Sequence, residues 1–129
     1  MSWQTYVDSS LMQSKAVAAA SIHGLDGTAW ARSPGFSSTP EEVTKILSNM
    51  AKESPMDFYS HGVTVNGVKY TFVKKGEHTI YGRGKENSGV CICTTNKCVV
   101  VAVYSNGMQP GSCNAVVEKL GDFLREANY

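Results

Sequence analysis

Cysteine and histidine are the residues of this chain whose chemistry could support nucleophilic catalysis or metal binding. Cys91 and Cys93 are two positions apart, so on a strand their thiols point to the same face. That spacing is not the paired C-x-x-C pattern of zinc sites, and no histidine lies near it in the sequence. We therefore expect Cys91, Cys93, Cys98 and Cys113 to be buried thiols that pack as small apolar side chains. A zinc- or thiol-dependent enzyme that uses Cys91, Cys93 or Cys98 stays an open alternative.

The other groups capable of catalysis form no pattern that indicates an enzyme. His23, His61 and His78 are scattered along the chain. The sequence contains no nucleophile-elbow, metalloprotease, phosphate-loop or dinucleotide-binding motif. Glu41 and Glu42 are adjacent carboxylates, but acidic residues in the first turn of a helix are explained by the helix dipole. The sequence therefore predicts no enzyme, no catalytic residue, no metal site and no cofactor.

Aromatic residues are concentrated at the two ends of the chain. Trp3 and Tyr6 are three positions apart, which places them on one side of a helix, and Phe123 and Tyr129 lie in the last segment. Terminal segments fray unless they dock on something. If two terminal helices pack side by side, these residues and Trp30 could line one shallow surface, and aromatic surfaces of this kind bind proline-rich segments. General burial statistics favour a core role for tryptophan, so both interpretations stand at this point.

Size, composition and charge narrow the class of protein. A chain of 129 residues fits one domain, and we expect a single domain over residues 1–129. A hydrophobic fraction of 42% and a charged fraction of 18% indicate a folded protein. The formal net charge of +1 argues against a strongly basic nucleic-acid binder. No apolar run could span a bilayer, and no charged segment followed by an apolar stretch opens the sequence, so we expect a cytoplasmic protein without a secretory signal.

Capping residues, turn residues and hydrophobic periodicity predict the elements. Thr39, Pro40 and Glu42 combine a capping box with a proline at the first helical position, so a helix begins there. Asn66–Gly67 lies between two alternating runs and is the strongest hairpin signal in the chain. The apolar run 98–103 predicts a central strand that is buried on both faces. The expected helices are 2–13, one from Pro40 and one after Pro110, and the expected strands are 16–23, 28–32, 63–65, 68–72, 78–82, 89–94 and 98–104.

The order of these elements predicts the fold class. The chain reads as helix, two strands, helix, five strands and helix. Consecutive strands joined by short turns must run antiparallel. We therefore expect an α+β fold, with one antiparallel sheet whose faces are covered by helices.

Several motifs together resemble the profilin family, in its compact, non-vertebrate form. Residues 2–8 resemble its opening W-x-x-Y-[VI]-D signature, and residues 26–31 resemble its D-G-x-x-W-A hairpin. Residues 67–70 and 82–85 resemble its mid-chain pattern, and residues 109–122 resemble its C-terminal helix. The resemblance covers the whole chain in order. It implies that the N- and C-terminal helices pack together on one face of the sheet, with a further helix on the other face.

The resemblance also implies a function. Profilins bind monomeric actin one to one and regulate filament assembly. They sequester actin at high concentration and deliver it to filament ends with proline-rich partners such as formins, which implies a cytoskeletal location. Phe123 stands where many profilins have histidine or tyrosine, so one hydrogen bond to the ligand would be missing here. The poly-proline surface that the resemblance implies consists of Trp3, Tyr6, Trp30, Phe123, Leu124 and Tyr129.

Two further sites follow from the same resemblance. A phosphoinositide site, for phosphatidylinositol 4,5-bisphosphate at the membrane surface, would use Lys74, Lys75, Arg83 and Lys85, since these cations complement phosphate oxygens. The actin-binding surface that the resemblance implies consists of Phe72, Val73, Lys74, Arg83, Lys85, Gly89, Met108, Gln109, Gly111, Asn114 and Lys119.

The alternative function is that of a small ligand-sensing or scaffold α+β domain with no actin binding, in which the aromatic residues are core.

Overall fold

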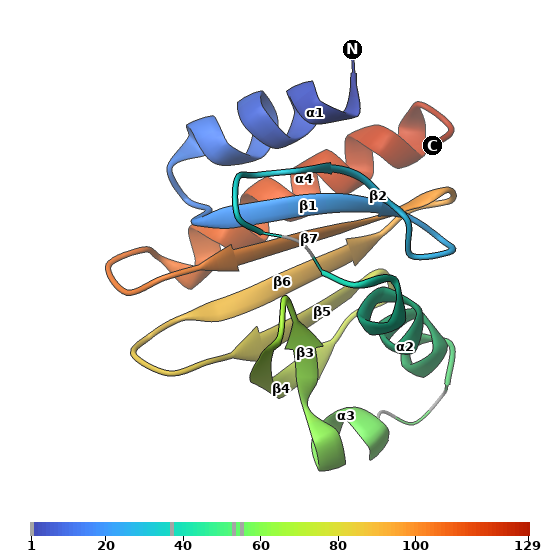
Figure 1. The fold of residues 1–129 in the computed structure, drawn as a ribbon, viewed down its shortest axis with the longest axis vertical. Coiled ribbons are helices and arrows are strands. Elements are labelled where there is room, and N and C mark those ends of the chain that lie inside the picture. Colours follow the sequence, from blue (N-terminus) through green and yellow to red (C-terminus); the bar gives the residue numbers. More distant parts are fainter. Residues whose placement is uncertain (1, 37, 53, 55) are drawn as a thin grey trace.

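One antiparallel sheet forms the centre of the molecule in the computed structural model, which describes residues 2–36, 38–52, 54 and 56–129. Its strands run in the order β2-β1-β7-β6-β5-β4-β3 (Figure 1). All neighbouring strands are antiparallel, as the sequence predicts. Their bounds are β1 Ala19–Gly24, β2 Ala29–Arg32, β3 Val63–Val65, β4 Val68–Lys75, β5 Thr79–Arg83, β6 Gly89–Thr94 and β7 Cys98–Tyr104.

Strand β7 is buried on both faces, which confirms the expectation from its apolar run. Val100 and Ala102 face one hydrophobic core, and Val99 and Val101 face a second core on the other side of the sheet. All four side chains are fully buried. The sheet therefore separates two apolar cores, and each core needs its own helical cover.

The N-terminal helix and α4 (Pro110–Glu126) cover the first core together (Figure 1). Val7 and Leu11 from the N-terminal helix meet Val117 and Leu124 from α4 in this core, and all four are fully buried. The implied pairing of the two terminal helices on one face of the sheet is thus confirmed.

The N-terminal helix is one helical segment with an unusual middle. It begins as α1 (Trp3–Thr5), widens into a π-helix, η1 (Tyr6–Leu11), and tightens into a 3₁₀ turn, η2 (Met12–Ser14). Ser2 caps its start as expected, because its hydroxyl accepts a hydrogen bond from the Thr5 amide at 3.2 Å. The wider turn of η1 turns Tyr6, Val7 and Leu11 toward the core together.

The second core is covered by α2 (Pro40–Met50) and by a short helix, α3 (Met56–His61). Val43 and Ile46 carry the buried stripe of α2. The sequence pattern does not predict α3, because six residues with one buried side chain, Phe58, show no helical periodicity. Among the described residues, no helix has the length and apolarity needed to cross a membrane.

Glu42 ties the start of α2 to a turn that is distant in sequence. The predicted capping box is present, with the Glu42 amide donating to Thr39 and the Glu42 carboxylate accepting from the Thr39 amide at 3.0 Å. The same carboxylate accepts from the amides of Asn66 at 3.0 Å and Gly67 at 2.9 Å, in the β3–β4 turn. One side chain therefore satisfies three backbone donors and joins two elements.

Replacing Glu42 by Gln should destabilise the protein by about 1–2 kcal/mol. A neutral carboxamide oxygen accepts weaker hydrogen bonds than a carboxylate, and the NH₂ group of Gln is a donor that cannot accept from any of the three backbone amides. Urea denaturation would measure the loss. Glu41→Gln is the matched control, since the Glu41 side chain is exposed and makes no such bonds. An equal effect of the two substitutions would contradict the role of Glu42.

Candidate functional site

Five aromatic rings form one continuous surface at the end of the molecule where both chain termini lie (Figure 1). Trp3 is its hub, with ring centroids 4.9 Å from Trp30, 5.3 Å from Tyr129 and 5.6 Å from Tyr6. Tyr6 continues the surface to Phe123 at 6.1 Å. These separations and tilts are favourable for aromatic pairs. We call these five residues the ring platform.

Three rings of the platform are open to solvent in spite of their apolar character, whereas Trp3 is half-buried and Tyr6, at 9% exposed, belongs to the first core. Trp30, Phe123 and Tyr129 are 40%, 50% and 42% exposed. Large apolar side chains that gather on a surface mark a place where a partner binds. The core interpretation of the tryptophans, which general statistics favour, is therefore wrong for Trp30.

Leu124 does not take part in this surface. It was expected to line the poly-proline site, but it is fully buried in the first core. The buried face of α4 carries Leu124 inward, whereas the neighbouring Phe123 points outward. Leu124 therefore supports the ring platform from below and offers no atoms to a ligand.

Tyr129 is held in place by backbone hydrogen bonds from two directions. Its main-chain oxygen accepts from the Lys97 amide and from the Thr95 hydroxyl, both at 2.7 Å, in the turn between β6 and β7. Its amide donates to the Leu124 carbonyl at 2.8 Å. These contacts fix the backbone of Tyr129, and its ring is thereby positioned against Trp3.

Trp30 depends on two residues that the sequence analysis did not single out. Gln4 donates to the Arg32 carbonyl at 2.8 Å and accepts from the Arg32 amide at 3.3 Å, which clips the N-terminal helix to β2. Gly24 lies under the indole, where an added Cβ would stand 2.9 Å from a Trp30 ring carbon. A polar residue next to Trp3 and a glycine two residues before the D-G motif are the available signals, but neither specifies such a contact.

A buried histidine sets the hairpin between β1 and β2. His23 is fully buried; its Nε2 lies 2.7 Å from the Ser21 hydroxyl, and its Nδ1 lies 3.2 Å from the Gly27 carbonyl. In the neutral ring Nδ1–H donates to that carbonyl and Nε2 accepts from the hydroxyl. Burial lowers the pKa of His23, against smaller opposite effects of the Gly27 carbonyl and the Glu42 charge. In the folded hairpin that carries Trp30, His23 is therefore in its neutral form.

A second surface, polar and cationic, lies on the sheet beside α4. The ammonium of Lys74 lies 5.2 Å from the centre of the Tyr81 ring, and the Tyr81 hydroxyl donates to the Glu118 carboxylate on α4. Burial and this bond to Glu118 raise the pKa of Tyr81 to about 12. Arg83 follows two residues after Tyr81 on β5 and so faces the same side. The predicted residues Lys74 and Arg83 are thus brought to one face.

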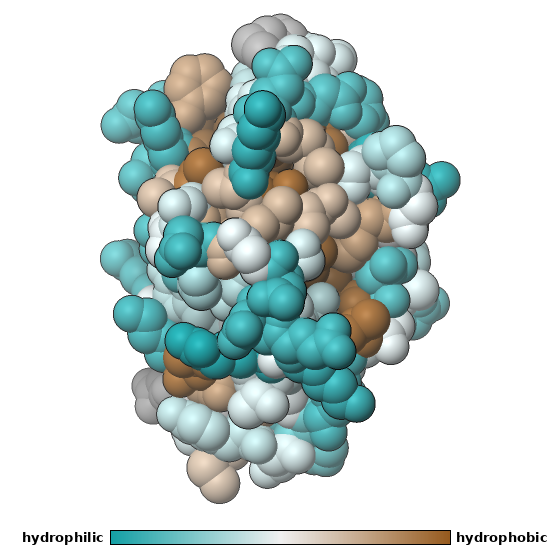
Figure 2. Space-filling view, turned by 90° about the vertical axis from the view of Figure 1, so that its left-hand side faces the viewer, coloured by the Kyte–Doolittle hydropathy of each residue, from teal (hydrophilic) through white to brown (hydrophobic). Residues whose placement is uncertain are grey.

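A hollow of about 320 Å³ adjoins this cationic surface. Arg83, Met108 and Gln109, three residues expected in the actin site, line it together with polar residues of the β5–β6 and β7–α4 loops. Figure 2 shows the side of the molecule where these loops lie, with hydrophilic side chains around strips of apolar ones. Val73, Lys85 and Gly111 are exposed and Asn114 is half-buried, so all four can contribute to a contact surface.

A bulge in β4 separates residues that the sequence analysis grouped together. The pairing with β5 shifts between Phe72 and Lys74, so these two residues face opposite sides of the sheet although they are two positions apart. Phe72 stacks on Phe58 with centroids 5.2 Å apart and is 6% exposed, in the second core. Lys75 turns to that side as well, where its ammonium donates to the Lys52 carbonyl at 3.1 Å.

Two other residues expected in the actin site also lie elsewhere. Lys119 lines a groove of about 400 Å³ between η1 and α4 with Tyr6 and Phe123, so it borders the ring platform. Gly89 is buried, and an added Cβ there would overlap the Tyr104 hydroxyl. Gly89 therefore shapes the sheet, and because it has no side chain it contributes no side-chain atoms to a contact.

The four cysteines are free and fully buried, as expected. Burial raises the pKa of the Cys91 thiol well above its usual range and that of Cys113 to about 12. Thiols of this kind are poor nucleophiles at neutral pH. Within the described ranges, no group of three or more histidine, cysteine or acidic side chains could hold a metal ion. The raised pKa values of these buried thiols argue against the thiol-dependent alternative.

Comparisons with known proteins agree on one family. The family model described as Profilin matches residues 1–129. The profilin of Bombyx mori is 41% identical over 130 residues, with all of both chains covered. The crystal structure of Acanthamoeba castellanii profilin II has a TM-score of 0.92 at 34% identity and covers 99% of this chain and 100% of its own. Mouse profilin IIa, in complex with a double repeat from the FH1 domain of mDia1, has a TM-score of 0.81 at 20% identity, with all of both chains covered.

Gly24→Ala should displace the Trp30 indole, because the new methyl group would meet the ring at 2.9 Å. Overpacking of this kind costs about 1–3 kcal/mol. The tryptophan emission and the ring-current shifts of Trp3 and Trp30 protons in NMR spectra should change. Gly111→Ala is the matched control, since nothing lies within 4 Å of its added Cβ. Unchanged spectra in Gly24→Ala would contradict the contact.

The stability of the protein should depend on pH through His23. The folded pKa of this ring lies below its ordinary value of 6.5, so the unfolded chain binds a proton that the folded chain excludes. The free energy of unfolding should therefore be constant above neutral pH and should fall as the pH decreases below 6.5. Urea denaturation across this range measures it. His23→Gln should flatten the dependence and His78→Gln should not; the same slope in both variants would contradict the assignment.

Proposed function

Since this chain belongs to the profilin family, we propose that it binds actin monomers one to one and regulates the assembly of actin filaments. It sequesters monomers at high concentration and, with proline-rich partners, promotes their delivery to filament ends. Profilins are not a family of enzymes. We infer a single profilin-like domain over residues 1–129. Its proposed location is the cytoplasm, where it acts on the cytoskeleton.

The ring platform is the observation that carries the proline-rich part of this function. A polyproline II helix is already extended and loses little conformational entropy when it binds. Its prolines pack on aromatic rings, and tryptophan N–H and tyrosine O–H groups can donate to its free carbonyls. We assign this site to Trp3, Tyr6, Trp30, Phe123 and Tyr129. The FH1 repeat bound to mouse profilin IIa, a protein of the same fold, supports a formin segment as the partner class.

The cationic surface is the proposed actin-binding site. Lys74, Arg83 and Lys85 supply positive charge, and Val73 is an apolar anchor that is 43% exposed. Such a mixture of apolar anchors and rim charges suits a specific contact with an acidic partner. Met108, Gln109, Gly111 and Asn114 complete the site. Phe72 and Gly89 would act only by shaping the sheet, and Lys119 belongs with the ring platform.

The same cations support phosphoinositide binding, with phosphatidylinositol 4,5-bisphosphate as the proposed lipid. Lys74, Arg83 and Lys85 can each approach phosphate oxygens. Lys75 faces the other side of the sheet and donates to Lys52, so we leave it out of this site. Because lipid and actin would share these residues, the two ligands should compete.

Trp3→Ala should weaken the binding of a proline-rich peptide by at least about 30-fold, because Trp3 contacts three of the other rings. Actin binding should stay unchanged. Trp3→Phe keeps a ring at the hub and is the matched control. Tryptophan fluorescence from Trp30 follows the peptide, and pyrene-actin assembly follows actin. A folded Trp3→Ala protein that has lost both activities would contradict two separate sites.

Arg83→Glu and Lys85→Glu should have the converse effect. A reversed charge in the cationic surface should weaken actin monomer binding by at least about 10-fold and leave the proline-rich peptide unaffected. Pyrene-actin assembly with and without a formin fragment separates sequestration from delivery to filament ends. Full actin binding by both variants would place the actin site elsewhere.

A further inference from the structure

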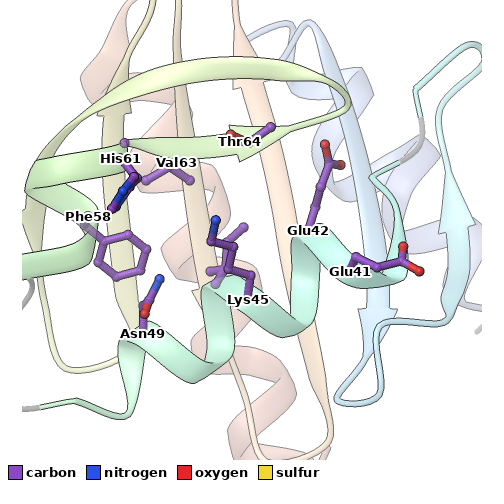
Figure 3. Close-up of a pocket in the computed structure, with 10 residues that line it drawn as sticks. Glu41, Glu42, Lys45, Asn49, Phe58, His61, Val63 and Thr64 are labelled. Atoms are coloured by element: carbon purple, nitrogen blue, oxygen red, sulfur yellow. The ribbon is translucent and has the colours of Figure 1, made fainter.

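A pocket of about 250 Å³ lies between α2, α3 and β3, on the sheet face opposite the ring platform (Figure 3). None of the residues expected in the proline, actin or lipid sites lines it. Ile46, Phe58 and Val63 give it an apolar wall; they are 3%, 1% and 1% exposed. Its volume is below the roughly 300–1,000 Å³ of sites for drug-sized ligands, so its occupant must be smaller than these.

Asn49 is the polar group that makes this pocket more than a surface depression. The residue is 7% exposed, and its carboxamide has no hydrogen-bond partner in the part of the chain that the structure describes. Figure 3 shows this side chain rising from α2 toward Phe58. Among the described side chains, only the Ser38 hydroxyl is a fully enclosed polar group without a partner, so the amide atoms of Asn49 keep a small exposed area through which water or a ligand can reach them. The amide is therefore free to bind whatever occupies the pocket.

Two basic side chains lie close to Asn49 along the pocket. Lys45 is on the preceding turn of α2, and His61 reaches over from the end of α3 (Figure 3). Neither side chain makes an ion pair or a hydrogen bond to any other described residue. Lys45, His61 and Asn49 thus supply three sets of uncommitted donors along one pocket.

Neither carboxylate that borders the pocket offsets these donors, and the nearby Asp57 on α3, which also interacts electrostatically with Lys45 and His61, is paired with Lys52 at 2.7 Å. Glu42 already accepts from the amides of Thr39, Asn66 and Gly67. Glu41 is exposed, and in Figure 3 its carboxylate points away from Lys45 and Asn49. The hydrogen-bonding capacity that remains is therefore mainly that of donors, which favours an anion over a cation.

We propose that this pocket binds a small carboxylate with an apolar body. The carboxylate accepts from Lys45, Asn49 and His61, and the body packs on Ile46, Phe58 and Val63. The site is independent of the proline, actin and lipid sites, because it uses none of their residues and lies on the other side of the sheet from the ring platform.

Three probes of nearly the same shape test the sign of this preference. Phenylacetate, phenethyl alcohol and phenethylamine are titrated separately into the ¹⁵N-labelled full-length chain, and NMR shifts are followed. A ligand of about ten non-hydrogen atoms should bind with a Kd of about 1 mM. We expect saturable shifts for phenylacetate at the Asn49 side-chain amide and at amides of α2 and α3, with the alcohol and the amine at least about 10-fold weaker. Absent saturation, or an amine that binds as tightly as the acid, would overturn the proposal.

Two substitutions test the residues. Lys45→Met keeps the length of the side chain and removes its charge, and Asn49→Asp places a repelling carboxylate in the same volume. Each should weaken phenylacetate by at least about 10-fold. Lys15→Met, at an exposed lysine near the end of the N-terminal helix, is the matched control and should bind as the unaltered chain does. Because Lys45 is exposed on α2, Lys45→Met should stay folded even if Asn49→Asp does not. A folded Lys45→Met protein with unchanged affinity would overturn the proposal.

Discussion

The docking of the N-terminal helix onto α4 is the contact on which the ring platform depends. A helical segment this short is not stable alone in water, so it needs the apolar contacts of Val7 and Leu11 with the first core. The helix carries Trp3 and Tyr6, and α4 carries Phe123 and leads to Tyr129. A surface built from both ends of a chain therefore exists only because one buried apolar seam holds the ends together. The buried Leu124 contributes to this seam, and its effect on a ligand would act through the rings above it.

The sheet then keeps the surfaces of the molecule apart. Helices on one face present the rings, and the uncovered part of the same face beside α4 presents Lys74 and Arg83. The bulge in β4 decides this distribution, because it directs Phe72 and Lys75 to the second core and Lys74 to Tyr81. The link from Tyr81 to Glu118 joins β5 to α4, so the cationic surface is attached to the same helix as the rings. The ligand of the ring platform and the ligand of the cationic surface would therefore bind to different residues of the same helix-and-sheet scaffold.

Local signals predicted much of this structure. The Thr39–Glu42 capping box, the Asn66–Gly67 turn and the apolar β7 all depend on neighbouring residues, and all were recovered. The five rings lie together, as the profilin resemblance implies, whereas residue types and spacing alone leave a core role open. The short helix α3, the bulge after Phe72 and the Gln4 clip were missed, because each depends on contacts between residues far apart in sequence. Lys75 and Lys119 were placed by the resemblance, and their actual faces depend on the bulge in β4 and on the groove between η1 and α4.

The Gln4 clip has a consequence for the behaviour of the protein in solution. Strand β2 is the outermost strand at its end of the sheet, and an open strand edge is a template for pairing with another chain. By occupying the amide and the carbonyl of Arg32, Gln4 closes part of that edge with a side chain. Resistance to self-association is thereby coupled to the seating of the N-terminal helix. Molecules in which that helix is detached would lose the ring platform and, at the same time, expose an unpaired edge of β2 that can pair with another chain.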